Sequence, residues 1–435
     1  MRNPYPGAAS RVATAPGPFV RLQSRILAGP PTRDFAEPLD LHVRRLGSCP
    51  VGGVSVTRAI DKSGLVGRGG AAFPAAQKWR AIADQDHGGA VVVVNAHEGE
   101  PASRKDRTLL ALRPHLVLDG AVVAAESVGA TEVIVYTADT YTEVREALRC
   151  AIAERRDSGY STMPISVVTA AHGYVAGEAS AAVHKLNGGR ATPVRIRPRE
   201  SGVGGRPTLV HNAETLAHAA LIARAGSAWF RQVGTPEVPG TALVTVGGAV
   251  RSPGTVVEAP LGATVAELVQ AAGGWTLRPQ AILFGGYAGV WLRAADVWSS
   301  PLGARGAPGV GASAACGILI VIPEGSCGFA EAAGVMSHLA RVTAGNCGPC
   351  VHGLRAMAET TTRVVNGGGT RDDVRRLHEL VDTVRGRGGC GHPDGAINQL
   401  VSALVTFAPH VDDHIRNGRC EGMRTPSYLP SRGWL

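Results

Sequence analysis

The sequence SGLVGRGGAAFPAAQKW, residues 63–79, places four glycines around Arg68 and continues to Phe73 and Lys78. Clustered glycines give the backbone access to positive φ and remove the Cβ atoms that would keep a ligand away. Their main-chain N–H groups can then turn toward an anion, and Arg68 and Lys78 add positive charge. The stretch is not the dinucleotide fingerprint G-x-G-x-x-G, because Ala72 occupies the third glycine position. It indicates a loop that cradles a phosphate or a planar ring, with a glycine-rich surface turn as the alternative.

The composition is typical of a globular protein with several domains. At 435 residues the chain exceeds what one hydrophobic core usually supports, so roughly two to four domains are expected. Hydrophobic residues make up 44% and charged residues 18%. The longest apolar run, near residues 318–322, is far shorter than the ~18 residues of a membrane span.

The net charge of +9 does not indicate a nucleic-acid-binding protein, because no basic helix carries interleaved aromatic residues. The eight cysteines are dispersed and no secretory signal is evident, so a disulfide framework is not expected. We expect a cytoplasmic protein that binds no nucleic acid and reaches a membrane only through its partners. Lysine is scarce, which suggests sites that need a compact ammonium. The four lysines are Lys62, Lys78, Lys105 and Lys185.

Residues 46–235 alternate uninterrupted apolar runs with helical patterns. The runs at 90–94, 131–136 and 165–168 predict parallel strands with helices on both faces of the sheet. Ligands in such folds bind beyond the carboxyl ends of the strands. Asn95 and Gly173 lie just past the expected ends of two of these strands, so both are expected in the binding crevice.

The remaining segments predict a tail, a second domain and a helical bundle. Residues 1–45 are rich in Pro, Gly and Arg and predict a disordered or loosely docked basic tail. Residues 236–300 predict a small α+β domain with a hairpin, a short helix near 264–272 and a strand at 282–284. We expect a connecting segment over 301–330, a helical bundle over 331–420 and a polar tail over 421–435.

Three further stretches concentrate polar side chains next to these expected strands. Residues 95–101, NAHEGEP, carry Glu98 and Glu100, whose carboxylates can accept hydrogen bonds from sugar hydroxyls. Residues 173–178, GYVAGE, combine glycines with Tyr174 and Glu178, and residues 208–215, TLVHNAET, gather hydroxyl and amide groups before a helix. The alternatives are a solvated acidic loop, a capping glutamate and an N-cap cluster, respectively.

A fifth stretch, Cys347-Gly-Pro-Cys350 with Cys390 further on, suits a metal, an iron–sulfur cluster or a redox dithiol. A helical pattern precedes it, whereas a thioredoxin-like dithiol would follow a strand. Three thiolates near a helical bundle favour a cluster over zinc, although four ligands are the rule for both.

Taken in order, the five stretches resemble the flavin-carrying, NADH-oxidising subunit of respiratory complex I, a family that includes diaphorase subunits of soluble hydrogenases and formate dehydrogenases. The resemblance covers residues 55–420 and implies a Rossmann-like α/β FMN domain, a ubiquitin-like β-grasp (SLBB) domain and an iron–sulfur helical bundle. It implies FMN, NAD(H) and a [4Fe–4S] cluster as cofactors, with Phe73 stacking on the dinucleotide and Glu100 serving NADH. The implied cofactor-binding residues are Gly67, Arg68, Gly69, Gly70, Phe73, Lys78, Asn95, Glu98, Glu100, Tyr174, Gly177, Glu178, His211, Asn212 and Thr215. The implied cluster ligands are Cys347, Cys350 and Cys390.

The chain departs from the family pattern at five positions. The resemblance implies an aspartate at His97, a glutamate at Ala179, an aromatic residue at Ala81, a basic residue at Ile196 and a cysteine at Ala344. The first four departures remove residues that the resemblance implies in the nicotinamide pocket, whereas most residues implied in the flavin pocket are retained. Ala344 replaces the first cysteine of the family's CxxCxxC. Three thiolates could hold a three-iron cluster, a four-iron cluster with an exchangeable ligand or one completed by Cys327 or Cys316, and an absent cluster is the alternative.

The resemblance implies a function as an electron-transfer subunit. NADH would give a hydride to FMN, and single electrons would pass through the cluster to a ferredoxin-like, thioredoxin-like or quinone-reductase partner among other oxidoreductase subunits. Hydride transfer needs no side-chain acid or base, so no catalytic residue is expected. The alternatives are an FMN carrier with another donor, such as reduced ferredoxin, and a non-catalytic docking subunit.

Overall fold

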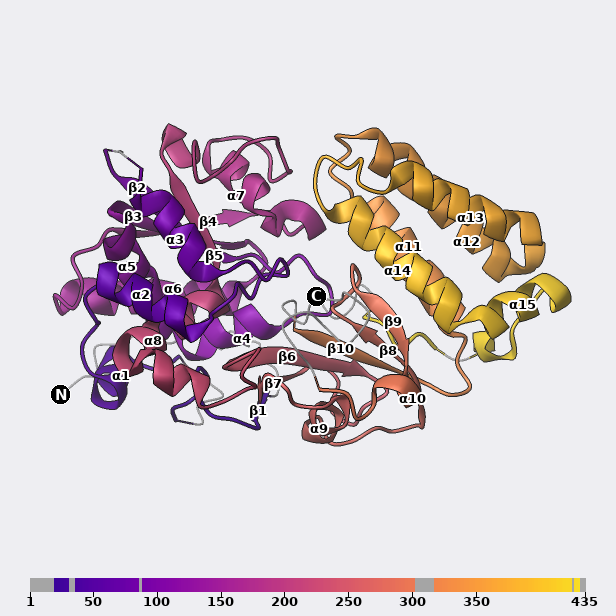
Figure 1. Cartoon of the computed structure of the whole chain (residues 1–435), viewed down its shortest axis with the longest axis horizontal. Coiled ribbons are helices and arrows are strands. Elements are labelled where there is room, and N and C mark those ends of the chain that lie inside the picture. Colours follow the sequence, from indigo (N-terminus) through magenta and orange to yellow (C-terminus); the bar gives the residue numbers. More distant parts are fainter. Residues whose placement is uncertain (1–18, 31–35, 86–87, 302–316, 425, 431–435) are drawn as a thin grey trace, which may run out of the picture.

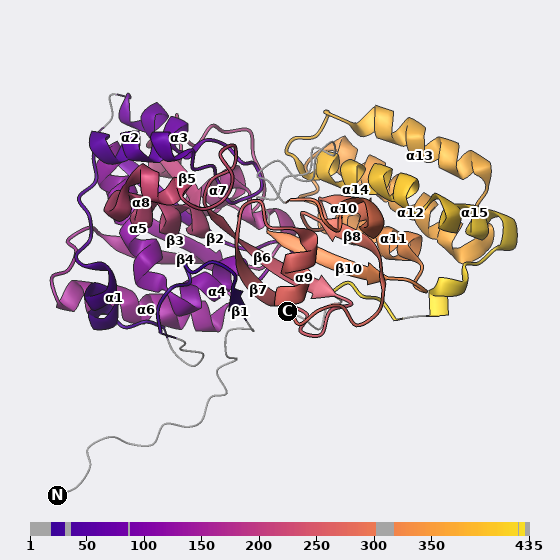
Figure 2. The same ribbon diagram turned by 60° about the horizontal axis from the view of Figure 1, so that its bottom comes forward.

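The computed structural model describes residues 19–30, 36–85, 88–301, 317–424 and 426–430. A four-stranded sheet with its helices comes first along the chain, followed by a six-stranded sheet and then by a group of helices. Both views place the six-stranded sheet between the other two units (Figure 1, Figure 2).

The first domain is built on a parallel sheet in the order β4 (Ile165–Ala170), β3 (Ala130–Ala138), β2 (Ala90–Ala96) and β5 (Thr208–Asn212). Side chains of β2 alternate between two cores: Val92 and Val94 face one, and Val91 and Val93 face the other. Strands buried on both faces read as continuous apolar runs, as predicted for this sheet. The helices of the domain are α2 (Val54–Ser63), α3 (Ala75–Ala83), α4 (Lys105–Leu112), α5 (Pro114–Val128), α6 (Thr142–Asp157), α7 (Ala179–Leu186) and α8 (Ala213–Arg231).

The second domain is a mixed sheet with the strand order β1-β7-β6-β10-β8-β9. The predicted hairpin is formed by β6 (Thr241–Gly248) and β7 (Thr255–Pro260), which pair antiparallel. The other elements are β8 (Pro279–Phe284), β9 (Val290–Arg293), α9 (Val265–Ala271) and α10 (Ala294–Val297). The connecting segment predicted over 301–330 is wrong in part, because β10 (Ile318–Pro323) is fully buried and pairs with β6 and β8. Residues 302–316, with Cys316, lie outside the described residues.

The prediction of a tail over 1–45 is wrong for residues 19–30 and 36–45. Strand β1 (Phe19–Arg21) pairs in parallel with β7, and α1 (Leu39–Leu46) packs against α5 and α6. Glu258 of β7 accepts hydrogen bonds from the N–H groups of Ile26 and Leu27 at 2.7 and 2.9 Å. The residues that make these hydrogen bonds are separated from β7 by more than 200 residues, so no local sequence pattern predicts the contact. Residues 1–18 and 31–35 lie outside the described residues.

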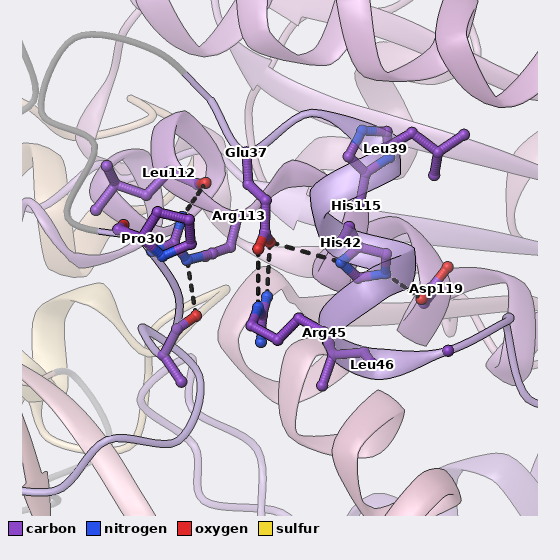
Figure 3. Close-up of polar contacts among 12 residues, drawn as sticks. Pro30, Glu37, Leu39, His42, Arg45, Leu46, Leu112, Arg113, His115 and Asp119 are labelled. Atoms are coloured by element: carbon purple, nitrogen blue, oxygen red, sulfur yellow. Dashed lines mark hydrogen bonds and ion pairs between the residues drawn. The ribbon is translucent and has the colours of Figure 1, made fainter.

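A buried polar cluster fastens α1 to the first domain (Figure 3). Asp119 of α5 is fully buried and accepts hydrogen bonds from His42 Nε2 and Arg155 Nη1, both at 2.8 Å. Glu37 accepts two hydrogen bonds from Arg45, at 2.8 and 2.6 Å. Burial opposes ionisation of Glu37, but the His42 ring, whose Nδ1 lies 3.6 Å from Oε2, and the hydrogen bonds from Arg45 outweigh it and lower the pKa to about 2. The charges are therefore paired, as buried charges must be.

The third unit is the predicted helical bundle. It comprises α11 (Gly328–Arg341), a π-helical turn at Pro349–Leu354, α12 (Arg355–Arg363), α13 (Arg371–Val384), α14 (His392–Thr406) and α15 (Ala408–Asn417). The described part of the predicted polar tail returns to this bundle, because Glu331 accepts hydrogen bonds from Ser427 Oγ at 2.6 Å and from Tyr428 N at 2.8 Å.

No single helix in the described ranges is long and apolar enough to cross a membrane. The pair α4 and α5 passes that test of length and composition only when taken together, and its two helices are bent by 98°.

Candidate functional site

The glycine loop between α2 and α3 is held by hydrogen bonds at Gly67 and Arg68, whereas the next two glycines make none with described residues. Gly67 N donates to Phe73 O at 2.8 Å, and Arg68 N donates to Thr215 Oγ1 at 2.9 Å, which ties the loop to the first turn of α8. Gly70 has φ +99°, a conformation that favours glycine. Within the described chain no hydrogen bond occupies the N–H group of Gly69 or Gly70. These two N–H groups are therefore available to donate hydrogen bonds to a ligand, as the sequence predicts for this loop.

The space beside this loop is not filled by the protein. A Cβ atom added at Gly67 would lie 3.6 Å from its nearest neighbour, Phe73 O, and one added at Gly69 would lie 3.4 Å from Asn212 Cβ. Both are ordinary contacts, so packing of the chain alone does not demand glycine at either position. A bound molecule that approaches the backbone closely would demand it.

The two cations predicted for this loop have different environments. Arg68 is buried and donates from Nη2 to Thr241 O at 3.1 Å, with Nε 4.0 Å from Glu214 Oε1. The expectation that its guanidinium serves the ligand is therefore not supported, because the side chain ties the first domain to β6. Lys78 is partly buried and makes no hydrogen bond or ion pair with a described residue. Its Nζ lies 5.8 Å from the ring centre of Phe73, which is 41% exposed.

His211 supports the loop from β5. Its Nε2 accepts a hydrogen bond of 3.0 Å from Trp79 Nε1, so the ring is held by α3. Burial, and next the charge of Lys78, depress the pKa of His211 well below its ordinary value. The imidazole of His211 is therefore neutral, and the positive charge beside the loop is that of Lys78.

A buried ion cluster beneath the loop was missed by the sequence analysis. Lys105 Nζ donates to Asp106 Oδ1 at 2.9 Å, to Asn212 Oδ1 at 3.0 Å and to Glu214 Oε2 at 2.9 Å. Asn212 also caps α8 by accepting from Glu214 N at 3.1 Å. The amide of Asn212 is therefore fixed by its own chain. Two signals were available, since Lys105 is one of only four lysines and stands with Asp106 shortly after the NAHEGEP stretch.

Two of the three predicted carboxylates cap helices. Glu98 is buried and accepts from Ser103 Oγ at 2.6 Å and from the N–H groups of Asp106 and Arg107 at 3.0 Å, at the start of α4. Glu178 accepts from Ser180 N at 2.8 Å at the start of α7. The capping alternative considered for Glu178 is therefore correct, and Glu98 plays the same role.

Glu100, the third carboxylate, lies at the boundary between the first and second domains. Its two oxygens accept hydrogen bonds of 2.8 Å from Tyr174 Oη and from Tyr287 N of the second domain. Burial raises the pKa of Glu100 to about 7, although both hydrogen bonds favour the charged form.

The end of β2 contacts the 3-10 turn at Tyr174–Gly177, which follows β4. Asn95 Nδ2 donates to Gly177 O at 2.6 Å, and a Cβ atom on Gly177 would lie 2.4 Å from His97 O. Glycine at 177 is therefore required for close packing of this turn against the end of β2. His97 stacks between Tyr136 and His172, with ring centres 5.5 and 5.8 Å apart. Burial lowers the pKa of His97 to about 4, so an uncharged ring occupies the family's aspartate position.

The other three departures from the family pattern in this domain place apolar residues where the resemblance implies aromatic or charged ones. Ala81 lies on α3, and Ala179 is the first residue of α7. Ile196 is 37% exposed. None of the three can supply the ring, carboxylate or base that the resemblance implies at these positions.

The predicted thiols gather at one end of the bundle. Burial raises the pKa of Cys347, but N–H groups of Gly389 and Cys350 outweigh this effect and lower it. Burial and the neighbouring Cys347 raise the pKa of Cys350 to about 12, with a further contribution from Cys390. The three sulfurs are therefore close enough to influence one another, as ligands of one cluster must be.

Cys327 is not a fourth ligand of this group. It caps the start of α11, whereas Cys347 follows the end of that helix. The 14 residues of α11 span roughly 20 Å at about 1.5 Å per residue. Cys316 lies outside the described residues.

The thiol group adjoins the first domain. Burial, and then the nearby Glu178 carboxylate, raises the pKa of Cys390. Asn346 Nδ2 donates to Pro193 O at 3.2 Å, and the ring centres of Tyr174 and His392 are 5.2 Å apart. The strand ends of the first domain and the cysteines of the bundle therefore face each other.

Three family models match the chain in the order of these units. They are the Nuo51 FMN-binding domain over residues 60–220, the SLBB domain over 243–286 and the NADH-ubiquinone oxidoreductase-F iron-sulfur binding region over 330–414. The NADH-quinone oxidoreductase F subunit 2 of Rhizobium meliloti is 30% identical over 391 residues, which are 84% of this chain and 90% of the relative. The chain belongs to the family of NADH-quinone oxidoreductase F subunits.

Other members and one solved structure extend this result. The NADH-quinone oxidoreductase F subunit of Mycobacterium tuberculosis is 30% identical over 403 residues, covering 87% of this chain and 88% of its own. The NADP-reducing hydrogenase subunit HndC of Solidesulfovibrio fructosivorans is 29% identical over 84% of this chain and 77% of its own. An NAD+-reducing [NiFe]-hydrogenase in the H2-reduced state matches with a TM-score of 0.76 at 30% identity over 83% of this chain. This chain spans 63% of that hydrogenase chain.

Membership of this family confirms the predicted fold class and the order of its three parts. The chain is an oxidoreductase subunit of the NADH dehydrogenase type, with FMN, NADH and a 4Fe–4S cluster as its cofactors. The docking alternative without catalysis is therefore not favoured. The relatives are themselves named as subunits of oxidoreductases.

Proposed function

We propose that this protein oxidises NADH at FMN and passes the electrons singly through an iron–sulfur cluster to an iron–sulfur partner. Bound FMN supplies the conversion of a hydride into single electrons, which no side chain of the protein can perform. The single observation that carries the proposal is the contact between Tyr174, which follows β4, and His392, two residues after Cys390, whose ring centres are 5.2 Å apart. It supports a short route between the two redox sites.

The residues assigned to FMN divide into contacts and supports. The N–H groups of Gly69 and Gly70 and the ammonium of Lys78 would hold the phosphate, since their hydrogen-bonding capacity is not used by described residues. Gly67 keeps the backbone accessible, and Phe73 offers a face for the dinucleotide. The supporting residues are Arg68, Asn95, Glu98, Tyr174, Gly177, Glu178, His211, Asn212 and Thr215.

We assign the cluster to Cys347, Cys350 and Cys390, with one iron position that no cysteine occupies at Ala344. The lowered pKa of Cys347 supports this assignment, because the N–H groups that stabilise its thiolate would also stabilise a cluster sulfur. Such a cluster has one exchangeable ligand. The partner that accepts its electrons is a ferredoxin-like or thioredoxin-like iron–sulfur protein of a cytoplasmic complex, attached to a membrane only through other subunits.

The three units divide this task. Residues 46–235 hold FMN and NADH, residues 236–300 together with β10 form the SLBB domain, and residues 331–420 carry the cluster. Glu100 is one of the contacts between the first two units, since it accepts hydrogen bonds from Tyr174 of the first and from Tyr287 N of the second. This arrangement supports a fixed distance between flavin and cluster.

An anaerobic titration of the purified full chain tests the proposal. We expect flavin absorbance near about 450 nm that bleaches when NADH is added. A colourless chain that retains no FMN even in excess would contradict the proposal.

One observation favours a second candidate function, an FMN carrier with another donor. His97 is uncharged and Ala179 has no carboxylate, so the nicotinamide side offers fewer partners than the family pattern. Flavin that stays oxidised in excess NADH but bleaches with reduced ferredoxin would establish this second function.

A further inference from the structure

A second group of soft ligands lies in the bundle, apart from the predicted cluster thiols. It consists of Cys327, His414 and Cys420, whose ligand atoms all lie within 4.8 Å of one another. All three side chains are buried, with 3%, 0% and 7% exposure respectively. They come from the start of α11, from α15 and from the segment after α15.

Two members of this group, Cys327 and His414, are hydrogen-bonded to each other. Cys327 Sγ lies 3.3 Å from His414 Nε2 and accepts a hydrogen bond from Ala330 N at 3.4 Å. His414 Nδ1 is buried and has no hydrogen-bond partner among the described residues.

The types of ligand in this group indicate which metal ion it would bind. Two thiolates and one imidazole are ligands of zinc, and sites with three protein ligands keep a fourth position for water. Two thiolates also balance the charge of a divalent cation, so the buried site would carry no net charge. Cys327 also lines a cavity of about 370 Å³ with Glu331 and Ser427, which provides a path for entry.

We propose that Cys327, His414 and Cys420 bind one Zn²⁺ ion that fastens the C-terminal end of the bundle to the start of α11. Binding releases two thiol protons to solvent, and two Zn–S bonds and one Zn–N bond form, with no change of oxidation state. Cys327 and His414 are 87 residues apart, so the ion closes a long loop of the chain. Closing a long loop restricts the unfolded chain and stabilises the folded one.

Zinc analysis of the full chain, expressed with added Zn²⁺ and then dialysed, tests this proposal. We expect about one zinc per chain, and a Zn K-edge spectrum with two sulfurs at about 2.3 Å and one nitrogen at about 2.0 Å. Cys420→Ser should lower the zinc content at least tenfold. Cys150→Ser removes a cysteine outside both groups and should change nothing.

Cys350→Ser separates the proposed site from the cluster thiols. It should keep its zinc, because Cys350 belongs to the predicted cluster group and not to this one. The far-ultraviolet circular dichroism of each variant shows whether it folds, and His414→Gln provides a second variant in case Cys420→Ser does not. The spectrum of the unaltered chain identifies the ligands independently of any variant.

Several results would overturn the proposal. One is a zinc content below about a tenth per chain in the unaltered protein. Another is zinc that survives in folded Cys420→Ser but is lost in Cys350→Ser, which would place the ion among the cluster thiols. A third is a Cys327–Cys420 disulfide in peptides from anaerobically purified protein.

Discussion

The hydroxyl of Tyr174 donates a hydrogen bond of 2.8 Å to Oε2 of Glu100, whose other oxygen accepts from Tyr287 N at the same distance. Tyr174 also meets the bundle, since its ring centre lies 5.2 Å from that of His392. Gly286, with φ +81°, is tightly placed beside this carboxyl, because a Cβ there would lie 2.7 Å from Glu100 Cδ. One carboxyl group thus contacts the first domain and the SLBB domain, and reaches the bundle through Tyr174.

Glu100 should make stability depend on pH. Burial raises its pKa from 4.5 to about 7, so the protonated form is favoured in the folded chain. Its contribution to stability is full below about pH 4.5 and is lost as pH rises through about 7. Glu100→Gln stays neutral and should escape this loss. Between pH 5 and pH 8 the variant should gain about 2–3 kcal/mol relative to the unaltered chain in urea unfolding.

The matched control for this measurement is Glu237→Gln, which alters an exposed glutamate in a loop. It should change the unfolding free energy by less than about 0.5 kcal/mol at either pH. If Glu100→Gln keeps the pH dependence of the unaltered chain, then the carboxyl is ionised and solvated in the folded protein.

Gly69→Val should remove flavin without unfolding the chain. The position has ordinary space for a Cβ atom toward Asn212, so the folded chain tolerates it. A branched side chain would occupy the open side of the loop, where the ligand must approach the backbone. We expect flavin content after gel filtration to fall at least tenfold, with a melting temperature of the apoprotein within about 3 °C of the unaltered value. Gly88→Val, where no atom lies within 4 Å, is the control. Unchanged flavin content in Gly69→Val would remove this loop from the site.

Lys78→Met should weaken FMN binding while keeping the apolar stem of the side chain. The ammonium is partly buried and makes no hydrogen bond or ion pair with the described residues, so its loss costs the apoprotein little. A charge-assisted hydrogen bond contributes about 1.5–3 kcal/mol, which corresponds to roughly 10–100-fold in dissociation constant. Quenching of FMN fluorescence by apoprotein measures this constant. Lys62→Met alters an exposed lysine of α2 and should leave it unchanged. Equal affinity in the two variants would show that Lys78 does not contact the phosphate.

The sequence predicts those parts of the fold whose signals are local. Continuous apolar runs predict the parallel sheet because both of its faces are covered, and Val91 and Val92 indeed face different cores. Strand β1 escapes prediction, and the apolar run of strand length at β10 is not assigned to a sheet, because the partners of both strands lie far along the chain. Phe19 pairs with Val256, and Ile318 pairs with Thr245.

The site shows a different limit of sequence reasoning. A glutamate in a ligand-binding loop and a glutamate that caps a helix have the same sequence signature, and Glu98 is the second kind. Arg68 looks like a ligand cation until its guanidinium is found on Thr241 O. The Cys327, His414 and Cys420 group has no spacing motif, because its first two members are 87 residues apart.

Asp119→Ala should destabilise the first domain severely. The carboxylate is fully buried and accepts hydrogen bonds from His42, Arg155 and Arg224 (Figure 3 shows the bond from His42). Removing it leaves buried cations unpaired, which costs about 3–5 kcal/mol. Urea unfolding measures this loss. Asp61→Ala breaks an exposed ion pair with Arg80 and should cost less than about 1 kcal/mol. A similar small cost for both variants would mean that water replaces Asp119 in its pocket.

Ala344→Cys should complete the cluster site. Ala344 precedes Cys347 by three residues, the spacing at which the first cysteine of CxxCxxC stands. Three thiolates leave one iron without a protein ligand, so exposure to air should lower the iron content of the unaltered chain from about four to about three per chain. The variant should retain about four under the same exposure. Ala340→Cys, near the end of α11, is the control and should lose iron like the unaltered chain. Equal iron loss in Ala344→Cys would show that the cysteine at 344 does not reach the cluster formed by Cys347, Cys350 and Cys390.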